Sequence, residues 1–277
     1  MFRKPWIASI LLFLAFVTVW HLLTIGGASQ QPALDPEYAR LAGQSAQSGQ
    51  VGAIPGPLQV AQRGYELFVN AFDRSNPNNV GIGWHLIYSL GRVMLGFGLA
   101  ALVAVPLGFA LGLLPGLYKA LNPFLQVLRP VSPLAWMPLA LYTFRDSAVS
   151  AIFIIFICAL WPMLINTAAG ASSVRGEWVN VSRVFGLGPI RHVTKIIFPA
   201  SVPMIMTGMR ISIGIAWFVI VAAEMVGAQS GIGYFIWNEW NNLQIASMIV
   251  AIVLIGIVGL GLDSLLAWAA YRSSFRE

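Results

Sequence analysis

The chain contains six apolar runs that are long enough to cross a lipid bilayer as helices. A bilayer core of about 30 Å takes roughly 20 helical residues. The runs cover residues 6–25, 86–114, 121–144, 148–171, 202–226 and 245–271. Only 9% of the 277 residues are charged, whereas about a quarter are charged in a typical soluble domain. The sequence therefore predicts an all-α integral membrane protein with six transmembrane helices.

The basic residues predict the orientation of these spans, because short cytoplasmic loops retain Lys and Arg. With the amino terminus inside, nine basic residues fall on the cytoplasmic side: Arg3, Lys4, Lys119, Arg175, Arg183, Arg191, Lys195, Arg272 and Arg276. Four fall outside: Arg40, Arg63, Arg74 and Arg145. Both termini are therefore expected in the cytoplasm. The positive charges are scattered and do not gather on one face, which argues against a nucleic-acid partner despite the formal net charge of +6.

The spans and their connections predict three regions. Residues 1–25 are expected to form the first transmembrane helix, residues 26–84 an extracytoplasmic loop, and residues 85–277 a core of five transmembrane helices. Within the loop, apolar residues recur at helical spacing over residues 57–72. We expect this amphipathic helix either to lie on the outer membrane surface or to pack against the other helices.

The inner connection, residues 172–200, is predicted to form a helical elbow that faces the cytoplasm. Residues 177–185 make a helix-length piece that stops at Gly186, because glycine tolerates the left-handed conformation at a helix end. A second piece, residues 189–198, begins with proline in its first turn and is expected to end before Pro199. The elbow is too short to have a core of its own, so we expect it to dock to another protein.

Charged residues inside the spans are candidates for a transport pathway, because an ionisable group in the bilayer costs several kcal/mol unless it is paired or hydrated. Arg92 and Arg129 lie near the ends of their spans, where each is able to snorkel to the headgroups. Arg210 lies deeper in the fifth span. It is expected either to attract an anion or to form a structural pair with Asp263 or Glu224.

The third run contains Pro130, Pro133 and Pro138, and each removes a backbone hydrogen-bond donor. Broken helices at membrane depth commonly line cavities. We therefore place the pathway wall here, beside Ser132 and Trp136, with packing between spans as the alternative role of Trp136. The predicted pathway residues are Arg129, Ser132, Trp136, Arg210 and Glu224.

The elbow also carries a spaced motif. Asn180-Val181-Ser182 is followed after three residues by Gly186 and, after nine more, by Ile196-Ile197-Phe198-Pro199. This pattern resembles the cytoplasmic motif of permease subunits of binding-protein-dependent ABC importers, in which Glu-Ala-Ala precedes Gly and Ile-x-Leu-Pro. The glycine, isoleucine and proline match in register, whereas the acidic triplet and the leucine of the motif do not.

Longer stretches are similar to one branch of this family. Residues 128–140, Leu-Arg-Pro-Val-Ser-Pro-Leu-Ala-Trp-Met-Pro-Leu-Ala, look like the third-span motif of the nitrate, sulfonate, taurine and bicarbonate permeases. Arg145-Asp146-Ser147, residues 156–163 and residues 231–242 most resemble cyanobacterial nitrate/nitrite and bicarbonate permeases. The resemblance implies nitrate or nitrite as the first expected substrate, bicarbonate as the second, and taurine or another sulfonate as the third.

The resemblance further implies a type I ABC importer permease fold, present as a homodimer around a central anion pathway in the bacterial inner membrane. The partners implied are two ATP-binding subunits, which bind ATP and Mg, and an extracytoplasmic substrate-binding protein. In this family the elbow is the coupling helix that contacts the ATPase. The residues carried over are Glu177, Asn180, Val181, Ser182, Arg183, Gly186, Arg191, Ile196 and Pro199. Among these, Glu177 partly replaces the missing glutamate of the motif, since it lies about one turn earlier on the helix.

The chain itself is expected to be non-catalytic and to hold no cofactor. The sequence has no Gly-x-x-x-x-Gly-Lys-Ser/Thr phosphate loop, and its histidines, at positions 21, 85 and 192, are isolated. The single cysteine, Cys158, lies within an apolar run, where a passive buried role is expected. A stand-alone channel or secondary transporter is the alternative class, although it leaves the basic elbow without a function. An integral-membrane enzyme is less well supported, because paired acids and metal ligands are missing from the sequence.

Overall fold

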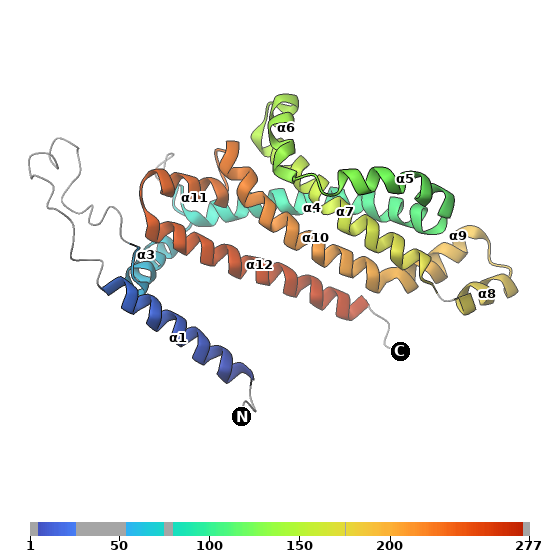
Figure 1. Cartoon of the computed structure of the whole chain (residues 1–277), viewed down its shortest axis with the longest axis horizontal. Coiled ribbons are helices and arrows are strands. Elements are labelled where there is room, and N and C mark those ends of the chain that lie inside the picture. Colours follow the sequence, from blue (N-terminus) through green and yellow to red (C-terminus); the bar gives the residue numbers. More distant parts are fainter. Residues whose placement is uncertain (1–4, 26–53, 75–79, 175, 274–277) are drawn as a thin grey trace, which may run out of the picture. The chain divides into compact units, whose positions relative to one another are not determined.

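A computed structural model describes residues 5–25, 54–74, 80–174 and 176–273. All regular structure in these ranges is helical (Figure 1). The elements are α1 (Pro5–Ile25), α3 (Pro57–Val69), α4 (Ile82–Leu113), α5 (Pro115–Leu128), the 3-10 turn η2 (Pro133–Trp136), α6 (Met137–Phe144), α7 (Ser147–Ser172), α8 (Gly176–Val184), α9 (Pro189–His192), the π-helical η3 (Val193–Ile197), α10 (Phe198–Gly227), α11 (Ile232–Asn241) and α12 (Ile245–Ser273). The predicted all-α class is confirmed.

Five helical segments among the described residues are long and apolar enough to cross a membrane: Trp6–Thr24, Ile82–Leu113, Ser147–Ser172, Pro189–Gly227 and Ile245–Arg272. They coincide with five of the six predicted spans. The third predicted span, residues 121–144, is not one continuous helix, because it divides into α5, η2 and α6. Pro130 and Pro133 lie at the division, where their missing N–H groups prevent α5 from continuing. The helix is therefore broken at these prolines, as the sequence predicted.

Contacts within the chain define two compact units. Unit 1 comprises Met1–Ile82 and Ile236–Val253. Unit 2 comprises Gly83–Phe235 and Leu254–Glu277. Unit 2 therefore holds the elbow and all five residues predicted for the pathway.

The core of unit 2 is built around α7 and α10, which lie side by side (Figure 1). Helix α4 also approaches α7 closely, and it does so at glycines. A β-carbon added to Gly96 would lie 2.7 Å from Cγ2 of Ile155, and one added to Gly108 would lie 2.6 Å from Cβ of Thr167. Such contacts hold helices together where lipid provides no hydrophobic drive for association.

Helix α3 of unit 1 confirms the predicted amphipathic helix, although it ends at Val69 and not at Phe72. One part of its surface packs inside the unit: Val60 is buried, and the Arg63 guanidinium donates to the Ser247 hydroxyl at 2.9 Å. Its large apolar side chains Leu58, Tyr65 and Phe68 are exposed. The helix thus has both a packed surface and an exposed apolar surface. Its place on the outer membrane surface stays a prediction.

The elbow consists of α8, a turn at Gly186, and α9. Gly186 has a φ of +60°, the left-handed conformation expected of a glycine stop. Helix α9 does not end before Pro199 as predicted, because it continues through η3 into α10 as one helical segment, Pro189–Gly227. Pro199 removes one backbone hydrogen bond from this continuous segment, and the wider π turn of η3 lies directly before it.

Candidate functional site

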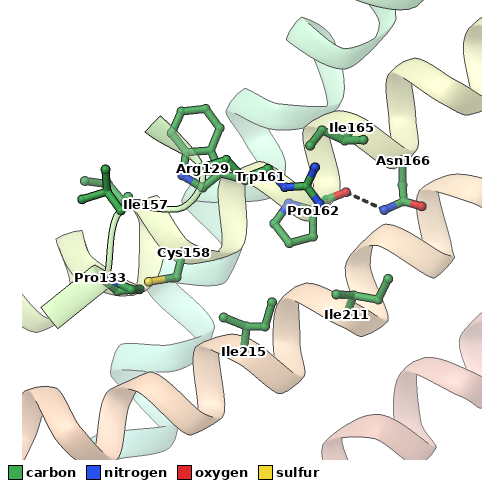
Figure 2. A pocket seen from close by; sticks show the side chains of 11 residues that line it. Arg129, Pro133, Ile157, Cys158, Trp161, Pro162, Ile165, Asn166, Ile211 and Ile215 are labelled. Carbon is green, nitrogen blue, oxygen red and sulfur yellow. Dashed lines mark hydrogen bonds between the residues drawn. The ribbon is translucent and has the colours of Figure 1, made fainter. Parts of the chain in front are cut away.

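Unit 2 contains a hollow of about 290 Å³ between the proline break, α7 and α10 (Figure 2). Arg129, Val131 and Pro133 come from the break, whereas Ile211 and Ile215 come from α10. The wall from α7 consists of Ile157, Cys158, Trp161, Pro162, Ile165 and Asn166. Most of the lining is apolar, and its polar groups include the Arg129 guanidinium, the Asn166 amide and the Trp161 indole N–H. Cys158 is buried as predicted.

Two further hollows continue this one along α5 and α7. One, of about 530 Å³, shares Arg129 and Ile165 with the first and adds Tyr118, Asn122 and Gln126. The other, of about 350 Å³, shares Tyr118 and Ile165 and adds Lys119. We call the three together the α5–α7 hollows.

The lining of the α5–α7 hollows is positively charged. Arg129 and Lys119 both belong to it, and no described aspartate or glutamate does. In the described part of the chain, no carboxylate lies within 4.0 Å of the Arg129 guanidinium. A lining with cations and without acids attracts anions and repels cations.

Glu224, another predicted pathway residue, lies elsewhere in unit 2. Its side chain is fully buried, and its carboxylate accepts hydrogen bonds from the Ser89 hydroxyl at 2.7 and 2.9 Å. It also accepts from Arg92 Nη1 at 2.6 Å and from the Gly233 amide at 3.1 Å. A side chain enclosed in this way does not line the α5–α7 hollows. The structure therefore groups Glu224 with α4 and the start of α11, and not with Arg129.

The same cluster fixes the turn that joins α10 to α11. Arg92 donates to the carbonyl of Ser230 at 2.7 Å and to its hydroxyl at 2.7 Å. The amide of Gly231 donates to His85 Nδ1 at 3.0 Å, and the amide of Ile232 donates to the Ser89 hydroxyl at 2.8 Å. The Arg92 side chain is only 11% exposed. The expectation that Arg92 snorkels to the headgroups is therefore wrong: its charge is neutralised inside the protein.

Arg210 pairs with Asp263. Its Nε and Nη2 atoms donate to the two carboxylate oxygens at 3.1 and 2.9 Å. The sequence left open whether Arg210 attracts an anion or pairs with Asp263 or Glu224. The structure shows the pair with Asp263. Both side chains are about half exposed in the isolated chain.

The remaining predicted pathway residues, Ser132 and Trp136, do not line the α5–α7 hollows. Ser132 is exposed and precedes η2, where its carbonyl accepts from the Ala135 amide at 3.0 Å. Trp136 is half-buried and packs against the core that α7 and α10 build. That position matches the alternative packing role given to Trp136.

The elbow presents both polar and apolar side chains. Glu177, Asn180 and Arg191 are exposed, whereas Ile196 and Pro199 are half-buried. Val181, Ser182 and Arg183 belong to α8, but their side chains lie outside the described part of the chain. Large apolar groups are also exposed here, at Val184, Phe185 and Ile190.

The sequence reasoning missed the polar lining contributed by α5 and α7. Tyr118, Asn122 and Gln126 recur every four residues ahead of the predicted Arg129, which places them on one face of a helix. Asn166 is a lone amide within the apolar fourth run. Both signals are present in the sequence, but these side chains are uncharged, whereas charge and proline mark most of the predicted pathway residues.

Removing Arg210 tests the role of its pair. We expect Arg210→Ala to lower the amount of assembled permease, because Asp263 is left without its partner in an apolar setting. The exchanged double variant Arg210→Asp/Asp263→Arg is expected to restore assembly. Size-exclusion chromatography of solubilised membranes measures both. Normal assembly of Arg210→Ala with reduced anion uptake would instead favour Arg210 as a pathway charge.

Residues 93–274 match the family model described as the binding-protein-dependent transport system inner membrane component. The nitrate import permease protein of Synechocystis sp. is 45% identical over 221 residues, which is 80% of each chain. The bicarbonate transport system permease protein of Synechococcus elongatus is 36% identical over 258 residues, 92% of this chain and 84% of the relative. A chain of the MetNI methionine ABC transporter in inward-facing conformations superposes with a TM-score of 0.63 at 16% identity, covering 73% of this chain and 100% of that chain.

The chain therefore belongs to the family of binding-protein-dependent transport system inner membrane components. It has the type I ABC importer permease fold. As a multi-pass membrane permease it is a non-catalytic subunit, and partner subunits hydrolyse ATP and deliver the substrate.

Proposed function

We propose that this chain is the permease subunit of an ATP-driven importer of nitrate and nitrite. The observation that carries the proposal is the acid-free lining of the α5–α7 hollows, with Arg129 unpaired among the described residues. A path with this charge suits a small anion. The higher identity to a nitrate permease than to a bicarbonate permease, 45% against 36%, favours nitrate. Bicarbonate is the alternative substrate.

The assembly that we propose contains two copies of this chain around one pathway, two ATP-binding subunits and an extracytoplasmic substrate-binding protein. Both termini lie in the cytoplasm. The excess of basic residues in the inner connections supports this orientation. The elbow then faces the ATP-binding subunits.

The elbow is proposed to couple ATP hydrolysis to the pathway. Exposed Phe185 and Ile190 offer apolar anchors, and exposed Arg191 offers a charge-assisted contact, for the ATP-binding subunit. Because α9 runs through η3 into α10 without a break, a displacement of the elbow is passed directly to Ile211 and Ile215 in the wall of the first hollow.

The test is ATPase activity of the complete complex in liposomes, with its substrate-binding protein, titrated separately with nitrate and bicarbonate. We expect nitrate to stimulate ATP hydrolysis. If bicarbonate alone stimulates ATP hydrolysis, the substrate is bicarbonate and not nitrate. Stimulation by neither anion would contradict both substrates and overturn the proposal.

A further inference from the structure

We propose that the first hollow is an anion-binding site that prefers weakly hydrated univalent oxyanions, so that nitrate and nitrite bind there more tightly than bicarbonate. The inference rests on the proposed function and deepens it. Its central groups are Arg129, Asn166 and the apolar side chains around them (Figure 2).

The proline break places the charge of this site. Helix α5 ends at Leu128, and Arg129 begins the link that runs to η2 at Pro133. The guanidinium of Arg129 is therefore carried by a fixed helix end and reaches both the first hollow and its neighbour. A guanidinium is planar and presents parallel N–H donors, which match two oxygens of a planar oxyanion.

Asn166 supplies a further polar group, from α7. Its Nδ2 atom donates to the carbonyl of Pro162 at 2.8 Å, which holds the amide in place (Figure 2). One amide hydrogen remains for an anion, since an asparagine amide has two. The site thus offers donors from the end of α5 and from α7.

The rest of the wall provides selectivity. Ile157, Ile165, Ile211 and Ile215 supply no hydrogen bonds, so an anion that lies against them gives up the water on that side. Nitrate and nitrite have no hydrogen to donate. Bicarbonate also carries a hydroxyl donor, and the good side-chain acceptor that the lining offers for it is Asn166 Oδ1. Where the hydroxyl does not reach that oxygen, leaving it unpaired weakens binding by about tenfold or more.

The test is protection from thiol labelling in the complete complex, without ATP. An Ile165→Cys reporter is placed in a Cys158→Ala background, because Ile165 lines all the α5–α7 hollows. Glu66→Cys on the exposed side of α3 is the control. We expect nitrate and nitrite to slow the reaction of a methanethiosulfonate with Ile165→Cys at about tenfold lower concentration than bicarbonate, and not to slow it at Glu66→Cys. Arg129→Gln is expected to abolish the protection.

If Ile165→Cys does not assemble, Ile211→Cys reports on the same hollow. Equal protection by bicarbonate, or protection that survives Arg129→Gln, would overturn the inference. If nitrate stimulates the ATPase of the complex but does not protect the cysteine from labelling, the inference about the first hollow is also overturned. The proposed function as a nitrate importer would then still stand. Protection by nitrate without nitrate-stimulated ATPase would support the site and count against the proposed function.

Discussion

Glu224→Ala is expected to destabilise the permease by about 3–5 kcal/mol, the range found when one partner of a buried ion pair is removed. The substitution leaves the Arg92 guanidinium without its carboxylate in a site where it is only 11% exposed. It also removes the acceptor of the Ser89 hydroxyl and of the Gly233 amide. We therefore expect loss of the α10–α11 turn as an ordered element and a large fall in the yield of folded protein.

The measurement is thermal unfolding of the solubilised complex, followed as a double-mutant cycle with Arg92→Ala. The double variant is expected to be no less stable than Glu224→Ala alone, because it leaves no unpaired charge behind. Glu66→Ala is the control, since Glu66 belongs to an exposed pair with Arg63 and exposed pairs contribute little. Destabilisations that simply add in the double variant would show that the two charges act independently and would contradict this reading of the cluster.

Gly231 also supports the cluster that Arg92, Ser89 and Glu224 form. It has a φ of +116°, and a β-carbon at this position would overlap the carboxylate of Glu224. The backbone of the turn therefore approaches the carboxylate as closely as only glycine allows. The cluster depends on this close approach as well as on the ion pair.

Much of the fold was predictable because each step depends on local properties. The length of an uncharged run determines whether a helix can cross the membrane, and this located α1, α4, α7, α10 and α12. Proline removes a donor wherever it stands, so the break after α5 was also predictable. The left-handed turn at Gly186 followed from its place after a short helix.

The candidate site was less predictable because it depends on distant contacts. Arg92 and Glu224 are 132 residues apart, and nothing in either span indicates that they meet. Arg92 lies near the end of its apolar run, which suggested that it reaches the headgroups. In the structure, α10 instead places the buried carboxylate of Glu224 beside it. Arg129 was found by its charge, but Asn166 and Gln126 join it only because α5 and α7 face the same hollows.

The second large effect is expected at Gly186, where valine should uncouple ATP hydrolysis from import while the permease still folds. A non-glycine residue in the left-handed region loses about 1–2 kcal/mol, and a β-branched one resists positive φ most strongly. A β-carbon at Gly186 would meet no other atom within 4 Å. The effect is therefore one of backbone conformation: the angle between α8 and α9 changes, and the proposed contact with the ATP-binding subunit is lost.

Gly188→Val is the matched control for this prediction. Gly188 lies two residues further along the same elbow, has an ordinary φ of −64°, and likewise has open space around an added β-carbon. We expect anion import per ATP hydrolysed, measured in liposomes, to fall about tenfold in Gly186→Val, the change that about 1.4 kcal/mol produces, and to stay near the original value in Gly188→Val. Equal losses in both variants would mean that bulk on the elbow, and not the left-handed turn, disturbs coupling. Unchanged import in Gly186→Val would remove the turn from the mechanism, because its only structural consequence is the backbone strain that the variant introduces.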